Sequence, residues 1–251
     1  MPPVTKPAKK LETLSIPGAN GDIVTSEGGY EPYDRKFTVG VSRSLGDLEQ
    51  IVQYLEQDGS WVWSNEPDKI YTARQTARFD FARMARHYKT DITVTVQPIK
   101  RGILPPVSFS DWTMAYDTAL YLPNDGNTRS EPSYAFELQS APAWFVLWTS
   151  EGSHQIVVGP RDTYNNLRIT LDTATGNATG TLVYTDDTTR TGYLTDLVEV
   201  RNVETRQYED ITALRLPAGG EPAYIKQVEP PPGEESSIAF GVSASDTTAY
   251  I

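Results

Sequence analysis

The stretch Ala143-Trp144-Phe145-Val146-Leu147-Trp148 decides the fold class, because it is an apolar run of strand length between turn residues. Short β-branched segments follow it, and turn residues such as Gly152 and Gly176-Asn177 separate them. That spacing is typical of a β-sandwich. The strands expected in this half of the chain are Ala143–Trp148, Gln155–Val158, Leu167–Leu171, Thr181–Tyr184 and Tyr193–Val200.

The first half also contains strand patterns, together with one segment of helical periodicity. Lys36–Val41, Ser60–Ser64 and Asp91–Val96 alternate or are rich in β-branched residues, which predicts strands. Leucine and other apolar residues recur at helical spacing over Leu45–Leu55, behind Ser44 as a suitable N-cap. We therefore expect a mainly β protein with one α-helix in its N-terminal part.

One stretch, Ala73–Lys89, is compatible with two structures. It is rich in good helix formers, so its composition allows a helix. It could equally form two strands joined by a turn near Arg86. The residues alone leave both alternatives open.

The charge of the 251-residue chain is unevenly distributed. The whole chain holds 22 basic and 33 acidic side chains, a net charge of −11. Residues 1–124 are nearly balanced, with 14 basic and 15 acidic side chains, whereas residues 125–251 hold 8 and 18. Because a turn-rich segment, 122–127, lies at this divide, we predict two domains, 1–124 and 125–251, with the boundary somewhere within 100–130.

The composition argues against several classes of function. An acidic chain is poorly suited to gripping nucleic acid or an anionic membrane. The segment Met1–Lys6 lacks the apolar core of a signal peptide, and no apolar run approaches the ~20 residues of a membrane helix. We therefore expect a soluble protein made without export, without membrane partners and without sequence-specific binding to nucleic acid.

Neither a catalytic nor a metal or cofactor site is predicted. The chain has no cysteine, and its two histidines, His87 and His154, lie in no recognisable metal or triad motif. Asp186-Asp187 is best explained as a hairpin tip, and Gly18-Ala19-Asn20-Gly21 lacks the following helix that a phosphate site needs. We expect no enzyme activity, no metal ion and no cofactor.

Two aromatic or basic clusters have both a functional and a structural explanation. The basic run from Arg74 to Lys89 is interleaved with aromatic residues, so it could contact nucleic acid, form a solvated strand face or pair with acids of a neighbouring subunit. Trp144 and Trp148 are four residues apart on one expected strand and so point the same way. They either face the opposite sheet as core or form a platform for stacking a sugar ring.

The order of motifs in the first hundred residues resembles a known family. A strand ends in the turn Pro17-Gly18-Ala19-Asn20-Gly21-Asp22, and a charged strand, Arg35–Val41, precedes the expected helix. Glu66-Pro67-Asp68-Lys69-Ile70-Tyr71 then leads into a further ribbon. This order is similar to that of the distal tail proteins of bacteriophages with long, non-contractile tails. Looser similarities continue through Asn124–Asn127, Ile169–Gly176 and Leu214–Gly220.

The resemblance implies a specific architecture and role. The N-terminal part would be a belt domain that closes a ring of six copies, and the C-terminal part would be a galectin-like β-sandwich. The resemblance also favours strands over a helix in Ala73–Lys89. The residues that it places in the ring are the turn Pro17–Asp22, the strand Arg35–Val41 and the ribbon Tyr71–Phe81. Within these and the adjoining motif it singles out Pro17, Gly18, Gly21, Asp22, Arg35, Phe37, Glu66, Pro67 and Tyr71.

The role implied is structural. The ring, single or stacked on a second one, would be a hub at the distal end of the virion's tail, assembled in the host cytoplasm. Its partners would be the tail tube protein, the tail-associated tip protein and receptor-binding proteins. The alternative is a carbohydrate-binding β-sandwich acting alone, with Trp144 or Trp148 as its stacking platform.

Overall fold

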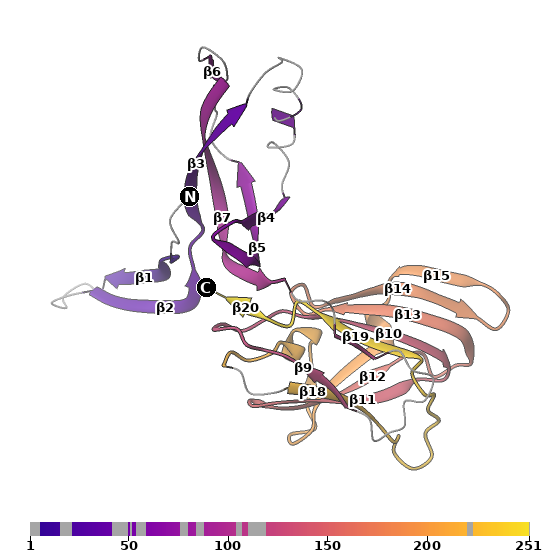
Figure 1. Ribbon diagram of the computed structural model, residues 1–251. Helices are drawn as coiled ribbons and strands as arrows, with labels where there is room; N and C mark the ends of the chain where they lie inside the picture. Colours follow the sequence, from indigo (N-terminus) through magenta and orange to yellow (C-terminus); the bar gives the residue numbers. More distant parts are fainter. Residues whose placement is uncertain are drawn as a thin grey trace. The chain divides into compact units, whose positions relative to one another are not determined.

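The computed structural model describes residues 6–15, 22–41, 50, 52–53, 59–75, 80–83, 88–103, 107–109, 119–219 and 223–250. The chain divides into two compact units, the first ending at Ile103 and the second running from Leu104 to Tyr250. This division lies within 100–130, and it assigns the segment 104–124 to the second unit. Both units are built mainly of antiparallel strands, so the mainly β prediction is confirmed (Figure 1).

The N-terminal unit is organised around one long strand, β7 (Tyr88–Gly102). Strand β3 (Tyr33–Val41) pairs along it in one antiparallel register, and β5 (Glu66–Gln75) pairs with it in another. Strand β4 (Gly59–Trp63) pairs antiparallel with β5, and β6 (Ala82–Arg83) pairs with the start of β7. Strands β1 (Lys9–Ser15) and β2 (Asp22–Tyr30) form a separate two-stranded sheet.

The described residues of the ambiguous stretch Ala73–Lys89 lie in strands, apart from Asp80 and Phe81, which belong to no regular element. Its first residues finish β5, and Ala82 and Arg83 pair with Lys89 and Tyr88 across a hairpin. The expected helix, Leu45–Leu55, lies almost entirely outside the described residues. Gln50, Val52 and Gln53 are the described residues of that segment, and they are helical.

The C-terminal unit is a sandwich of two six-stranded antiparallel sheets, drawn as two layers in Figure 1. The first sheet has the strand order β15-β14-β13-β10-β19-β8, and the second has the order β17-β16-β12-β11-β18-β9. The strands of the first sheet are β15 (Thr189–Tyr193), β14 (Asn177–Tyr184), β13 (Tyr164–Asp172), β10 (Ser133–Ser140), β19 (Gly241–Ser245) and β8 (Val107–Phe109). Those of the second are β17 (Tyr208–Glu209), β16 (Val198–Asn202), β12 (Gly152–Val158), β11 (Ala143–Thr149), β18 (Ala223–Val228) and β9 (Ala119–Leu122).

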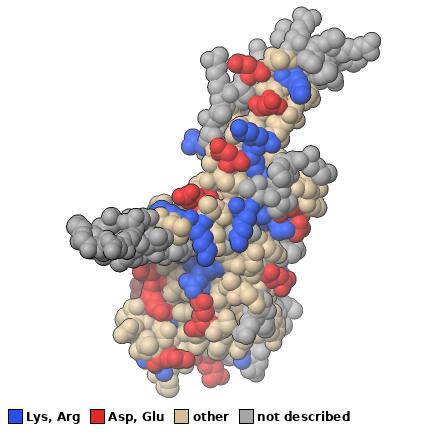
Figure 2. All heavy atoms as spheres, turned by 90° about the vertical axis from the view of Figure 1, so that its left-hand side faces the viewer, with Lys and Arg blue, Asp and Glu red and all other residues tan. Residues whose placement is uncertain are grey.

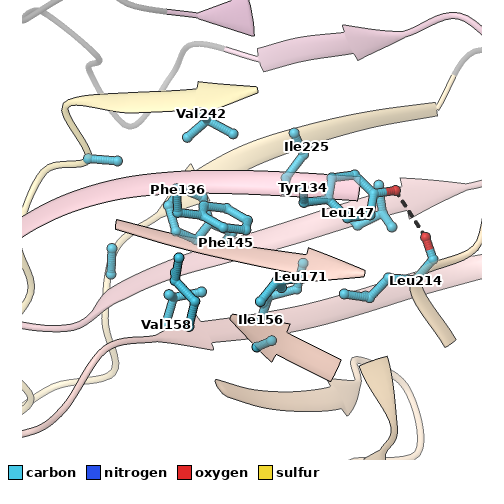
Figure 3. Close-up of a cluster of buried hydrophobic side chains, with 14 of the residues drawn as sticks. Tyr134, Phe136, Phe145, Leu147, Ile156, Val158, Leu171, Leu214, Ile225 and Val242 are labelled. Atoms are coloured by element: carbon cyan, nitrogen blue, oxygen red, sulfur yellow. Dashed lines mark hydrogen bonds between the residues drawn. The ribbon is translucent and has the colours of Figure 1, made fainter. Parts of the chain in front are cut away.

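Apolar side chains from both sheets fill the space between the two layers. Phe136 of the first sheet and Phe145 of the second lie with their ring centroids 4.7 Å apart (Figure 3). Tyr134 is completely buried, and its hydroxyl donates a hydrogen bond to the carbonyl oxygen of Leu214 at 2.9 Å. A buried hydroxyl needs such a partner, so this bond fixes the 3-10 turn Ile211–Leu214 against the core.

Two parts of the sandwich differ from the pattern expected. Tyr193–Val200 is not one strand, because the 3-10 turn Thr195–Leu197 separates the end of β15 from the start of β16. The break lets the chain leave one sheet and enter the other. The remaining short strand, β20 (Ala249–Tyr250), ends the described chain. Across the described ranges, we find no helix that is long and apolar enough to cross a membrane.

Candidate assembly surface of the N-terminal unit

One face of the N-terminal sheet collects most of the described residues that the family resemblance singles out. Alternation along β3 places Arg35 and Phe37 on this face, directly opposite Val94 and Ile92 of β7. The same face carries a small hydrophobic cluster whose buried members are Trp63, Tyr71, Ala73, Ile92, Val94 and Val96. Phe37 packs edge-on against Trp63, with ring centroids 5.2 Å apart.

Charged side chains are buried within this aromatic cluster. Tyr71 donates its hydroxyl hydrogen to the Glu66 carboxylate. The ammonium group of Lys100 binds the other oxygen of the same carboxylate at 3.2 Å, and that of Lys69 lies 3.7 Å from it. Glu66 is 8% exposed and Lys100 is 4% exposed. A charge buried to this extent must be paired and hydrogen-bonded, and Glu66 is the common partner.

Arg35 completes the group from the neighbouring strand. Its guanidinium carbon lies 4.6 Å from the centroid of the Trp63 ring and 5.0 Å from that of Tyr71. Lys100 also approaches the Tyr71 ring, at 5.3 Å. Cation–π contacts of desolvated groups contribute roughly 2 kcal/mol each. We call Arg35, Trp63, Glu66, Tyr71 and Lys100 the charge–aromatic cluster.

The surroundings shift the pKa values of the titratable groups in this cluster. Burial by itself would raise the pKa of Glu66, but the hydrogen bonds from Tyr71 and Lys100 outweigh burial and lower it below the ordinary value of 4.5. Burial and the bond to Glu66 raise the pKa of Tyr71, and burial raises that of Tyr33, which lies outside the cluster and packs against the same hydrophobic side chains. Glu66 is therefore ionised and the two tyrosines are neutral at physiological pH.

The opposite face of the sheet is polar. Thr38 donates to the carboxylate of Asp91 at 2.6 Å, and Thr95 donates to that of Asp34 at 2.8 Å, each across the β3–β7 pair. These four side chains form cross-strand ladders that suit a solvated face. Figure 2 shows acidic and basic side chains interspersed over the described residues of the face it draws. Mixed charges of this kind can pair with their opposites on another chain.

Several strand edges of this unit have no partner strand within the described parts of the chain. Strands β1 and β2 pair only with one another, and β3 and β4 each pair on one side. A two-stranded sheet is marginally stable by itself in water, and an exposed edge is a template for pairing with another chain. These edges are candidate contacts between subunits.

The structure places the predicted ring residues in several different positions. Arg35, Phe37, Glu66 and Tyr71 lie together in or beside the charge–aromatic cluster, and Pro67 is exposed next to it. Pro17, Gly18 and Gly21 lie outside the described residues, and Asp22 is the first residue of β2, paired with Ser15. The sequence analysis did not single out Lys100 or Trp63. A signal was present, because strand alternation places Lys100 on the same face as Val96 and Trp63 on the same face as Trp61.

The tryptophans proposed for sugar stacking lie on the second sheet of the sandwich. The prediction that they face the opposite sheet is wrong, because Ala143, Phe145 and Leu147 occupy the side of β11 that faces it and Trp144 and Trp148 point away. Trp144 is only 7% exposed and lines a pocket together with residues such as Pro160 and Arg161. Trp148 is half-buried, and Tyr224 stacks on its ring at 4.8 Å.

The other candidate groups occupy ordinary structural positions. His154 contacts the carboxylate of Glu209 at 2.7 Å between β12 and β17, and His87 lies outside the described residues. Asp187 adopts a positive φ of 64° at the tip of the β14–β15 hairpin, as expected. In the part of the chain that the structure describes, no three His, Asp or Glu side chains converge as metal ligands would.

The chain is similar in architecture to a solved phage protein. The chain superposes on the crystal structure of SPP1 Dit, described as a paradigm of the hub adsorption apparatus in phages that infect Gram-positive bacteria, with a TM-score of 0.53. The alignment covers 98% of this chain and 90% of that one. The two chains share a fold. Their sequences are 13% identical, so the likeness to SPP1 Dit concerns architecture. No family model and no curated protein matches the sequence.

Proposed function

We propose that this chain is a structural protein of a bacteriophage tail, the hub that joins the distal end of the tail tube to the host-adsorption apparatus. The observation that carries the proposal is the likeness to SPP1 Dit, since it extends over 98% of the chain and so includes both units. The order of sequence motifs, which resembles that of the distal tail proteins, supports it independently of the fold.

The proposed mechanism is assembly into a closed ring of six copies. Repeating one head-to-tail contact closes a ring and gives every subunit the same two neighbours. The edges of β1, β3 and β4 are suitable for such a contact, because each could add a strand to a neighbouring sheet. The charge–aromatic cluster would hold β3, β4, β5 and β7 in one geometry, so that the edges present a fixed register.

The proposed partners follow from the position of such a hub. One face of the ring would bind the tail tube protein and the other the tail-associated tip protein, with receptor-binding proteins attached to the sandwich. Because the C-terminal half is strongly acidic, the sandwiches of adjacent subunits would repel one another and stay apart. We assign the protein to the virion, with assembly in the host cytoplasm.

The test is the mass of the purified full chain in solution. One chain weighs 27.8 kDa, so a ring of six weighs about 167 kDa, and two stacked rings twice that. Light scattering behind a sizing column, over a hundredfold range of concentration, should give one of these masses, and negative-stain images should show rings. A monomer at every concentration, with no ring in the images, would contradict the proposal.

A further inference from the structure

The outer face of the first sheet of the sandwich is hollowed. A cavity of about 510 Å³ lies over β10, β13, β14 and β19, on the side facing away from the core. Its walls are residues such as Thr170 and Thr181, which point outward because Ile169 and Leu182 beside them are buried in the core. We call this hollow the trough.

The strand register sorts the outward side chains of the trough, together with those of the adjoining strand β15, into two rows. Residues directly opposite each other on neighbouring strands lie side by side, so each row crosses the sheet from β15 to β19. The first row is Tyr193, Thr179, Thr170, Ala135 and Ser243, and the second is Thr191, Thr181, Arg168, Glu137 and Gly241. Ala135 and Gly241 contribute little or no side chain, which makes the hollow at the β10–β19 end.

The trough is electrically neutral within a strongly acidic half of the chain. Among the described residues that line it, the charged side chains are those of Arg168 and Glu137, whose ion pair is made by two hydrogen bonds of 3.0 and 2.8 Å to one carboxylate oxygen. Threonine and serine hydroxyls, which both donate and accept, supply the remaining polar groups. Tyr193, 73% exposed, lies beside the trough on the adjoining strand β15, at the end of the first row.

We propose that the trough is a binding site for a neutral oligosaccharide. The rows of hydroxyl groups and the neutral ion pair could form hydrogen bonds with sugar hydroxyl groups. The exposed ring of Tyr193 could pack against the apolar face of a sugar ring. With ~4.8 Å between strands, the five strands from β15 to β19 span roughly 19 Å, room for several sugar units. The proposal uses the sandwich alone and does not rest on the hub function.

Other ligand classes fit the trough less well. A nucleic acid or another polyanion would need an excess of cations, and one arginine paired with a glutamate provides none. An apolar peptide would need hydrophobic side chains, which the two rows lack apart from Tyr193 and Ala135. This site is also on the sheet opposite to Trp144 and Trp148, so it replaces the stacking platform predicted from the sequence.

The experiment is affinity electrophoresis of the full chain in native gels containing dextran, glycogen, glucomannan or hydroxyethyl cellulose. At least one polymer should retard the wild-type protein in proportion to its concentration, which gives a Kd. Ala135→Trp fills the trough and should weaken that Kd about tenfold or more, since several hydrogen bonds are lost. Tyr193→Ala should weaken it about threefold or more, through loss of the ring face.

The matched control is Gln155→Trp, which places the same side chain on the outer face of the second sheet and should bind like wild type. Three results would overturn the proposal. The first is no retardation of the wild type by any of the four polymers, and the second is equal retardation of Ala135→Trp and wild type. The third is a change of oligomeric mass in Ala135→Trp, because the face would then be a contact between protein subunits.

Discussion

Tyr71 and Glu66, five residues apart on one strand, are joined by a hydrogen bond in the buried interior of the N-terminal sheet. The pairing of β5 with β7 shifts register between Tyr71 and Ala73, so β5 does not follow a regular pleat at this point. Both side chains belong to the segment Glu66–Tyr71 that the sequence analysis singled out. The motif thus has a structural role, because its tyrosine holds its carboxylate against Lys100.

Removing the hydroxyl of Tyr71 tests this bond directly. Tyr71→Phe keeps the ring under Arg35 but deletes the donor to a charged acceptor, so we expect the N-terminal unit to lose about 1.5–3 kcal/mol of unfolding free energy. Urea unfolding followed by tryptophan fluorescence measures it, because Trp61 and Trp63 lie in the same cluster. Tyr193→Phe, at an exposed site, is the control and should change stability by less than about 0.5 kcal/mol.

Neutralising Glu66 should cost more. Glu66→Gln leaves the buried Lys100 without its carboxylate, a change that typically destabilises a protein by about 3–5 kcal/mol. If the proposed ring depends on a fixed sheet geometry, the same variant should also shift the hexamer toward monomers in light scattering. A variant as stable as wild type would show that this carboxylate does not balance the buried lysine.

The contribution of Glu66 should also depend on pH in a defined direction. Its pKa in the folded protein lies below the ordinary value of 4.5, so folding favours the ionised form. The stabilisation is then fully present above that value, and it is lost as the pH falls through the folded pKa. The difference in unfolding free energy between wild type and Glu66→Gln should be constant from pH 7 to about pH 5.5 and shrink below about pH 4.5. A difference that grows on acidification would contradict the sign.

Gly180 of β14 lies where this strand approaches β13 closely under the trough. A Cβ atom at Gly180 would lie 2.0 Å from the carbonyl oxygen of Arg168, so the backbone must move to admit one. We expect Gly180→Ala to cost about 2–3 kcal/mol in thermal or urea unfolding of the sandwich. In Gly241→Ala, on the same sheet, the nearest contact is an ordinary 3.8 Å, and stability should stay within about 1 kcal/mol of wild type.

Gln227 tests a buried polar contact in the second sheet. Its side-chain amide donates to the carbonyl oxygen of Ser237 at 2.6 Å and accepts from the amide of Ala239 at 3.0 Å. Gln227→Leu leaves both backbone groups unpaired in the core, so we expect a loss of about 2–4 kcal/mol and faster proteolysis after residue 229. The half-buried Gln155→Leu, on the outer side of the same sheet, should be almost neutral.

Alternation predicted the strands well but could not assign every face. In β3 and β7, one parity is apolar and the other polar, so the sequence alone places Phe37 and Val94 on the buried side. In β11 both parities are apolar, and the run has no preferred side. Packing against Phe136 decides for Phe145, which turns Trp144 and Trp148 outward.

The sites differ in how far a sequence could reveal them. Glu66 and Tyr71 share a short motif that the family resemblance singles out, whereas Lys100 is 34 residues away from Glu66 in sequence and is brought to it only by the sheet register. The trough is lined mostly by short side chains, among them the threonines of β13 and β14, which in sequence are indistinguishable from those of any solvated sheet face. Only the register shows that Ala135 and Gly241 leave a gap among them.

The bonds of Gln227 close the base of the proline-rich segment 229–235. The segment leaves and rejoins the sandwich at two points that these bonds hold together. A change in the length of the segment therefore need not disturb the core. Each doubling of such a loop costs only about 0.6 kcal/mol. A peptide epitope or a small fluorescent domain could therefore be inserted between Pro232 and Gly233, to mark the position of every sandwich in an assembled particle.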